Sequence, residues 1–293
     1  MSARAGIAAC LAAVAAVALA GDAPERLKNA KVDVRPAAPG LAATVRALAA
    51  ADAGPLWIAY EVPTDGGHSL CCWDSAASIG HTRAPGCRLE GHNVTYSDDD
   101  ERGTVYLEGD RRVVVYVRAA HGRVDRVRAL SRSCGVDAGG LALHWLPDVT
   151  PADSAAFLGA LFDDPSVVRN VVDEALMALS LHADPAALDQ MIRVGRRHSS
   201  SHVRSQALFW LAQKAGRKAT ETITDAVSDD PESQVRQQAV FALSQLPHEQ
   251  GVPKLIELAR SHRDRHVRER AMFWLGQSED PRALAFFEQI LKN

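Results

Sequence analysis

The chain has 293 residues, of which 47% are hydrophobic and 24% charged, with a formal net charge of −3 at pH 7. This length can bury a full core and is enough for two domains. Residues 151–293 carry 17 Lys and Arg against 19 Asp and Glu, a net of −2. Nucleic-acid binding depends on concentrated positive charge, so we expect no nucleic-acid partner.

Residues 1–20 have the features of a secretory signal peptide. Arg4 supplies a positive n-region, Gly6–Val17 is apolar and rich in Ala, and Ala18-Leu19-Ala20 offers small residues at the cleavage site. The apolar run is shorter than the roughly 20 residues that span a bilayer, and no later segment is apolar enough to do so. We therefore expect cleavage before Gly21 and a periplasmic or extracellular protein without a membrane span.

The sequence predicts a small β-rich domain over residues 21–149. Strands are expected where β-branched and aromatic residues cluster. Glycine-containing turns at 108–110 and 121–122 join three of them into a β-meander. Residues 63–100 are rich in Gly, Pro, Ser and Asp and are expected to form a long loop region. The expected elements are a strand at 31–34, a helix at 41–51, and strands at 56–62, 104–107, 112–117, 123–130 and 141–146.

Four cysteines follow the signal peptide: Cys71, Cys72, Cys87 and Cys134. An even number in an oxidising compartment favours two disulfides. All four precede residue 135, so they would staple the N-terminal domain alone. Adjacent Cys71 and Cys72 are poorly placed to bond each other, because the small ring would strain the intervening peptide. One of them is therefore expected to pair with Cys87 and the other with Cys134, in either order.

The same loop region contains potential metal ligands. A His-x2-Cys and a Cys-x4-His spacing could supply a tetrahedral zinc site. Disulfides are favoured because thiolate zinc sites are uncommon in exported proteins and Cys134 would then lack a partner. We expect no metal and no cofactor, and we keep a metal-binding or redox-active N-terminal domain as the alternative. The histidines concerned are His68, His81 and His92.

Residues 150–293 repeat with a period of 32 residues, in about four units. Thr150 as N-cap and Pro151 at the first helical position mark the domain boundary. A Val-Arg pair recurs, followed at constant offsets by Ala, Phe, Leu and Gln. Repetition of this kind predicts a solenoid, in which each unit has a first helix, a turn and a shorter second helix. The repeated structural positions are Val203, Arg204, Gln213, Val235, Arg236, Gln245, Val267, Arg268 and Gln277.

The Val-Arg pair, with Ala four residues later and Leu eight residues later, resembles the short HEAT-like repeats named after phycobilin lyases. The resemblance covers roughly residues 165–293. The whole chain is also similar to exported bacterial proteins that join a cysteine-bearing domain to such repeats. The expected fold class is thus α+β: a small, β-rich, disulfide-stapled N-terminal domain followed by an α-solenoid of HEAT-like helical pairs.

The repeated polar residues have structural interpretations. We expect the glutamines to bind carbonyls at the helix ends and the next unit, with a role in lining a groove as the alternative. Ion pairs within each repeat are expected for the arginines, because aspartates such as Asp230 and Asp264 precede two of them. At the C-terminus, apolar residues have no following unit to cover them. We hypothesise that these contact a partner or a second copy: Phe286, Phe287, Ile290 and Leu291.

Motifs of common enzymes are absent from the sequence, including glycine-rich phosphate loops, the Gly-x-Ser-x-Gly elbow and His-Glu-x-x-His. HEAT-repeat hydroxylases bind iron through His-Glu pairs in several repeats, whereas the repeats here contain one such pair, His248-Glu249. We therefore expect a non-enzymatic scaffold that binds another protein through the concave face of the solenoid, formed by the second helices.

Overall fold

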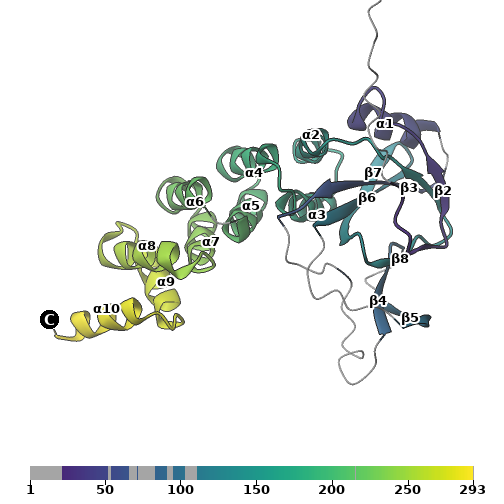
Figure 1. Cartoon of the computed structure of the whole chain (residues 1–293). Coiled ribbons are helices and arrows are strands. Elements are labelled where there is room, and N and C mark those ends of the chain that lie inside the picture. The colour runs from purple at the N-terminus through teal and green to yellow at the C-terminus, as the bar shows by residue number, and fades with distance from the viewer. Residues whose placement is uncertain are drawn as a thin grey trace, which may run out of the picture.

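The computed structural model describes residues 22–51, 54–65, 71, 83–90, 95–102, 111–214 and 216–292. Two sheets form the N-terminal part, and helices extend away from them in a row (Figure 1). The expected signal peptide, the expected strand at 104–107 and the side chains of Cys72, His68, His81 and His92 lie outside the described residues.

Within the described part of the chain, the strands and α1 occupy the N-terminal half, and only helices follow β9. The strands are β1 (Leu27–Lys28), β2 (Lys31–Val34), β3 (Leu56–Pro63), β4 (Arg83–Arg88), β5 (Thr95–Arg102), β6 (Arg112–Ala120), β7 (Arg123–Ser131), β8 (Gly135–Asp137) and β9 (Ala142–Trp145). The helices are α1 (Leu41–Ala51), α2 (Pro151–Leu161), α3 (Arg169–Ser180), α4 (Pro185–Arg197), α5 (Ser201–Lys214), α6 (Arg217–Asp229), α7 (Ser233–Ser244), α8 (His248–Ser261), α9 (Arg265–Gly276) and α10 (Pro281–Lys292).

The larger sheet has the order β2-β9-β3-β6-β7. The hairpin of β6 and β7 turns at His121-Gly122, where φ is 52° and 76°, as the sequence predicts. β9 departs from a simple up-and-down order, because it lies parallel between β2 and β3. The residues of β3 from Leu56 to Tyr60 are almost completely buried on both faces, as expected for a central strand with neighbours at both edges.

The smaller sheet has the order β1-β8-β4-β5 and covers one face of the larger sheet. Trp57, Tyr116 and Trp145 are buried between the two sheets, together with Cys87 and Cys134. Strands β4 and β5 lie within the region expected to be a long loop, so that expectation is wrong there. Their sequences, RAPGCR and TYSDDDER, are rich in residues that strands disfavour.

Helices α1, α2 and α3 pack on the other face of the larger sheet. Buried apolar residues form a continuous core from this face through the helical row to Phe286 in α10. The sheet therefore closes one end of the helical stack. None of the helices in the described part of the chain combines the length and apolar character needed to cross a bilayer.

The helical part is a two-layer stack of helical pairs, as the repeat predicts. First helices α3, α5, α7 and α9 contact one another in one layer. Second helices α4, α6, α8 and α10 form the other layer, which α2 begins (Figure 1). Thr150 caps α2 with a proline in the first turn, as predicted, and Asp184 caps α4 in the same way.

The two layers differ in spacing. Adjacent first helices lie in closer contact than adjacent second helices. In a curved stack the closer layer lies on the inside, so the first helices form the concave side. The expectation that second helices form it is therefore wrong, because the second helices are the more widely spaced layer.

Candidate functional site

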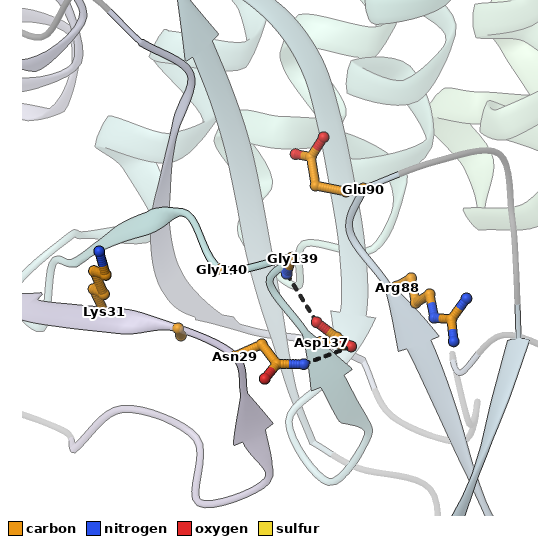
Figure 2. A pocket seen from close by; sticks show the side chains of 8 residues that line it. Asn29, Lys31, Arg88, Glu90, Asp137, Gly139 and Gly140 are labelled. Carbon is orange, nitrogen blue, oxygen red and sulfur yellow. Dashed lines mark hydrogen bonds between the residues drawn. The ribbon is translucent and has the colours of Figure 1, made fainter.

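A pocket of about 600 Å³ lies beside β1 and β8, and Figure 2 shows the side chains that line it. The Asp137 carboxylate is fixed by two donors. The Gly139 amide donates to Oδ1 at 2.8 Å, and Asn29 Nδ2 donates to Oδ2 at 3.0 Å. Gly139 has a φ of 69°, and a Cβ there would lie 2.6 Å from Glu90 Cγ. The turn therefore requires glycine at this position.

The second carboxylate of this pocket is also engaged. Glu90 accepts from Trp57 Nε1 at 2.9 Å and from Arg118 Nη1 at 2.7 Å. The described lining residues include Lys31 and Arg88 beside the two carboxylates, but no Ser, Cys or His. The pocket is a polar recess in which Glu90, next to β4 of the smaller sheet, binds side chains of the larger sheet.

The cysteines meet at the interface between the sheets. Cys71 and Cys134 form a disulfide, a pairing that one of the two predicted orders contains. The second pairing stays a prediction, because Cys72 lies outside the described residues. Cys87 is also disulfide-bonded, and its Sγ lies 3.9 Å from Cys134 Sγ. Because a disulfide sulfur is not a thiolate, Cys71 in this disulfide does not supply the thiolate ligand that the zinc interpretation assigns to it. In the described residues no group of three His, Cys, Asp or Glu is arranged to hold a metal.

A buried polar chain joins the sheet to the first helices. Ser154 Oγ lies 2.9 Å from Tyr60 Oη and 2.7 Å from His182 Nε2, and His182 Nδ1 lies 2.9 Å from the carbonyl oxygen of Ala178. Burial lowers the pKa of His182 to about 4, so its ring is neutral at pH 7.

The carbonyl of Ala178 can only accept, so Nδ1 of the neutral ring carries the proton. Nε2 then accepts from Ser154, whose oxygen accepts from Tyr60. Desolvation raises the pKa of the Tyr60 phenol, which therefore keeps its proton. The Ser-His pair is sealed, because Ser154 is 0% and His182 1% exposed. The chain locks the sheet onto the helices and is closed to substrates.

The repeated arginines form a ladder between units. Arg204 donates from Nε and Nη2 to Asp230 at 2.7 and 2.9 Å, and from Nη1 to the carbonyl of His198 at 2.8 Å. Arg236 donates from Nε and Nη2 to Asp264 at 3.3 and 3.0 Å. Each aspartate lies just before the first helix of the following unit. The expectation of pairing within a repeat is therefore wrong: the ion pairs connect successive units.

The repeated Val and Gln positions have opposite environments. The valines are buried in the core, and the glutamines are exposed. The backbone N–H groups of Gln245 and Gln277 close the last turns of α7 and α9. The Gln245 side chain donates to Ser244 Oγ in its own unit, not to the next unit. The residues concerned are Val203, Val235 and Val267, and Gln213, Gln245 and Gln277.

Five aromatic rings form a continuous row across three first helices. Phe209 contacts Trp210 at 5.1 Å and stacks on Phe241 at 6.1 Å between centroids. Trp274 lies 4.9 Å from Phe241 and 5.0 Å from Phe273. Phe273 is 50% exposed, and the other four rings are partly exposed. We call this row the aromatic ladder.

The repeat alone does not predict the ladder, because aromatic residues at repeat spacing are usually core residues. A signal was available within each first helix. The buried residues Val203, Ala207 and Leu211 define one stripe, whereas Phe209 and Gln213 lie on another. Each exposed Gln follows a ladder Phe by four residues, one helical turn. The alternative that the glutamines line an exposed surface agrees with this geometry.

The C-terminal apolar residues are not all placed as hypothesised. Ile290 is 44% and Leu291 86% exposed, but Phe286 is 2% exposed, so its assignment as a contact residue is wrong. Phe286 packs on Phe287, with ring centroids 5.4 Å apart, and the guanidinium of Arg260 lies over it. It is buried because it faces α8 and α9, whereas Leu291 faces away from them.

Comparisons with known proteins concern the helical part. The chain is similar to the complex of CpcE and CpcF of phycocyanin lyase from Nostoc sp. PCC7120, at 17% identity and a TM-score of 0.36, over 48% of this chain and 89% of that one. It is also similar to human deoxyhypusine hydroxylase in complex with glycerol, at 20% identity and a TM-score of 0.35, over 46% of this chain and 43% of that chain. No curated protein matches it in sequence. The family model described as HEAT repeats matches residues 220–293. The C-terminal helical pairs of this chain are HEAT repeats.

Proposed function

We propose that this chain is a non-enzymatic scaffold that binds another protein through the aromatic ladder on the concave side of its HEAT repeats. The ladder carries the proposal. Its rings pack on one another and are partly exposed, and the exposed residues Gln213, Gln245 and Gln277 each follow a ladder Phe by one helical turn. Large aromatic side chains surrounded by polar groups are typical of the residues that dominate protein–protein affinity.

The stack is suited to hold this surface rigid. Ion pairs of Arg204 and Arg236 connect successive units, and their aspartates precede the next first helix. The sheet closes the N-terminal end through the buried chain of Tyr60, Ser154 and His182. A surface held in one conformation loses little conformational entropy on binding, which favours affinity.

We also propose that the protein is exported and acts in the periplasm or outside the cell, with its N-terminal domain stapled by disulfides. The signal-like features of residues 1–20 support this. The Cys71–Cys134 disulfide agrees with an oxidising compartment. Cell fractionation of the full chain, with mass mapping of the mature N-terminus, tests the assignment: recovery in the cytoplasm with residues 1–20 intact contradicts it.

A redox-active N-terminal domain, with the repeats as a docking arm, is the second candidate. The observation that favours it is the 3.9 Å distance between the sulfurs of Cys87 and Cys134. An external thiol that reduced one disulfide would leave a thiolate next to a sulfur of the other disulfide, as thiol–disulfide exchange requires. Both side chains are 1% exposed, which opposes reaction with an external thiol. Incubation with glutathione followed by mass mapping tests it: rapid formation of mixed disulfides would favour this candidate over the scaffold.

Affinity capture from the envelope fraction tests the scaffold proposal. The full chain is the bait, beside the double variant Phe209→Ser/Phe241→Ser. Ile256→Ser on α8 is the matched control, because Ile256 is also partly buried but lies in the second-helix layer. We expect the ladder variant to lose a partner that the wild type and the control retain. Equal recovery by all three contradicts the proposal.

A further inference from the structure

A pocket of about 330 Å³ adjoins the aromatic ladder between the α7–α8 pair and the α9–α10 pair. The end of α7, the first turns of α8, the end of α9 and the turns that follow α7 and α9 line it. Trp274 of the ladder forms part of its wall, and the exposed residues Gln245 and Gln277 also line it. The ladder and this pocket therefore belong to one continuous surface.

The buried part of the pocket is apolar. Its four side chains of lowest exposure, between 0% and 3%, are those of Leu243, Leu246, Val252 and Leu255. The ionisable residues among its described lining, His248 and Glu279, are exposed. A charged group that entered the pocket would lose its hydration without gaining a buried partner. The interior therefore favours an apolar group.

The repeat shows which side chain this place lacks. Ser278 follows Leu246 by 32 residues, so the two occupy the same position in successive units. Leu246 is 3% exposed, which means that a leucine at this position packs into the stack. Trp274 stands where the preceding unit has Ala242, and it lines the pocket without filling it. The exchange of leucine for serine removes an apolar side chain at the edge of the open space.

The size and the exposed lining fit a peptide side chain. Ligand pockets have volumes of about 300–1,000 Å³, so this one lies at the lower end and suits a single large side chain. Gln277 is exposed, and its side chain has no hydrogen-bond partner among the described residues. An amide both donates and accepts, so it can bind the N–H and C=O groups of a peptide backbone.

We propose that this pocket binds one large apolar side chain, of the size of leucine, from the protein that the aromatic ladder binds. The inserted side chain contacts Trp274 and the buried leucines, and the amides of Gln245 and Gln277 bind the peptide groups beside it. Side chains inserted into such pockets are typical of the residues that dominate protein–protein affinity. The inference rests on the proposed function for its ligand, but the pocket can be tested without the partner.

Titration of the full chain with N-acetyl-leucinamide tests the pocket directly. The indole N–H signal of Trp274 is followed by nuclear magnetic resonance and assigned with the variant Trp274→Phe. We expect a saturable shift with a dissociation constant of about 1–10 mM, because a ligand with so few atoms binds weakly. N-acetyl-serinamide at the same concentration should leave the signal unchanged. No shift with either compound, or an equal shift with both, overturns the proposal.

Ser278→Leu introduces the side chain that the preceding unit has at this position. It should raise the dissociation constant of N-acetyl-leucinamide at least about tenfold. Ser228→Leu is the matched control, because Ser228 is also half-buried but lies on α6, outside the pocket. Circular dichroism verifies that each variant folds, and Ser244→Leu narrows the pocket from α7 should Ser278→Leu unfold. An unchanged dissociation constant in a folded pocket variant overturns the proposal.

Affinity capture separates this inference from the scaffold proposal. Neither Phe209 nor Phe241 lines the pocket, so Phe209→Ser/Phe241→Ser tests the ladder and Ser278→Leu tests the pocket. We expect Ser278→Leu to recover at least about tenfold less of the ladder's partner than the wild type. Full recovery by Ser278→Leu, with loss in the ladder variant, overturns the pocket assignment and leaves the scaffold proposal in place. Full recovery by both variants overturns both.

Discussion

Replacing Asp230 by asparagine should cost about 3 kcal/mol of unfolding free energy. The side chains of Arg204 and Asp230 are 8% and 5% exposed, so the variant leaves a guanidinium without its counter-ion in a buried site. Breaking a buried ion pair on one side costs about 3–5 kcal/mol. The lower value applies here, because the carbonyls of His198 and Ser199 still accept from Nη1 of Arg204.

Urea denaturation followed by circular dichroism measures the effect of Asp230→Asn. Glu257→Gln is the control, since its ion pair with Lys254 joins side chains that are 65% and 40% exposed. Exposed pairs contribute at most about 1 kcal/mol. The double variant Arg204→Met/Asp230→Leu should recover most of the loss, because it removes both charges together. Equal costs for Asp230→Asn and Glu257→Gln would refute the inter-repeat role of the pair.

Two further substitutions test the buried contact between the sheet and the helices and the packing inside the repeats. The pKa of His182 is lowered to about 4, so the unfolded chain, titrating near 6.5, binds more protons between these values. The free energy of unfolding should therefore fall by about 3 kcal/mol as the pH drops from 6.5 to 4. The His182→Gln variant, denatured with urea at several pH values, should not show this decrease. Gly251→Ala should destabilise by about 1–3 kcal/mol, because its Cβ would lie 2.3 Å from the Leu243 carbonyl oxygen. Gly276→Ala, with no atom within 4 Å of its Cβ, should not lower the melting temperature; equal loss in both would contradict the packing argument.

The helical part could be predicted from the sequence because the same pattern of capping and buried positions recurs in several repeats. The caps at Thr150 and Asp184, the buried valines and the two-layer stack all follow from spacing and turn chemistry. Which layer faces inward depends on how closely whole helices approach. Many side-chain contacts together determine the distance between neighbouring helices, and no single sequence motif predicts it.

Non-local pairing limited the prediction of the N-terminal part. β9 inserts between β2 and β3 although β3 precedes it by more than 80 residues, and no local pattern specifies such a partner. The chain of Tyr60, Ser154 and His182 likewise joins residues that are distant in sequence. The aromatic ladder was missed for a different reason: Phe and Trp at repeat spacing are usually core, and only their offset from the Val-Ala-Leu stripe distinguishes them.

Site-specific photo-crosslinking tests the central claim most directly. A photoreactive residue at Gln245 lies beside the aromatic ladder, whereas one at Glu257 lies on α8 in the second-helix layer, and both side chains are exposed. With the full chain in the envelope fraction, we predict a crosslinked partner from position 245 and none from position 257. Crosslinks from position 257 alone, or from neither position, would contradict a binding role for the concave side.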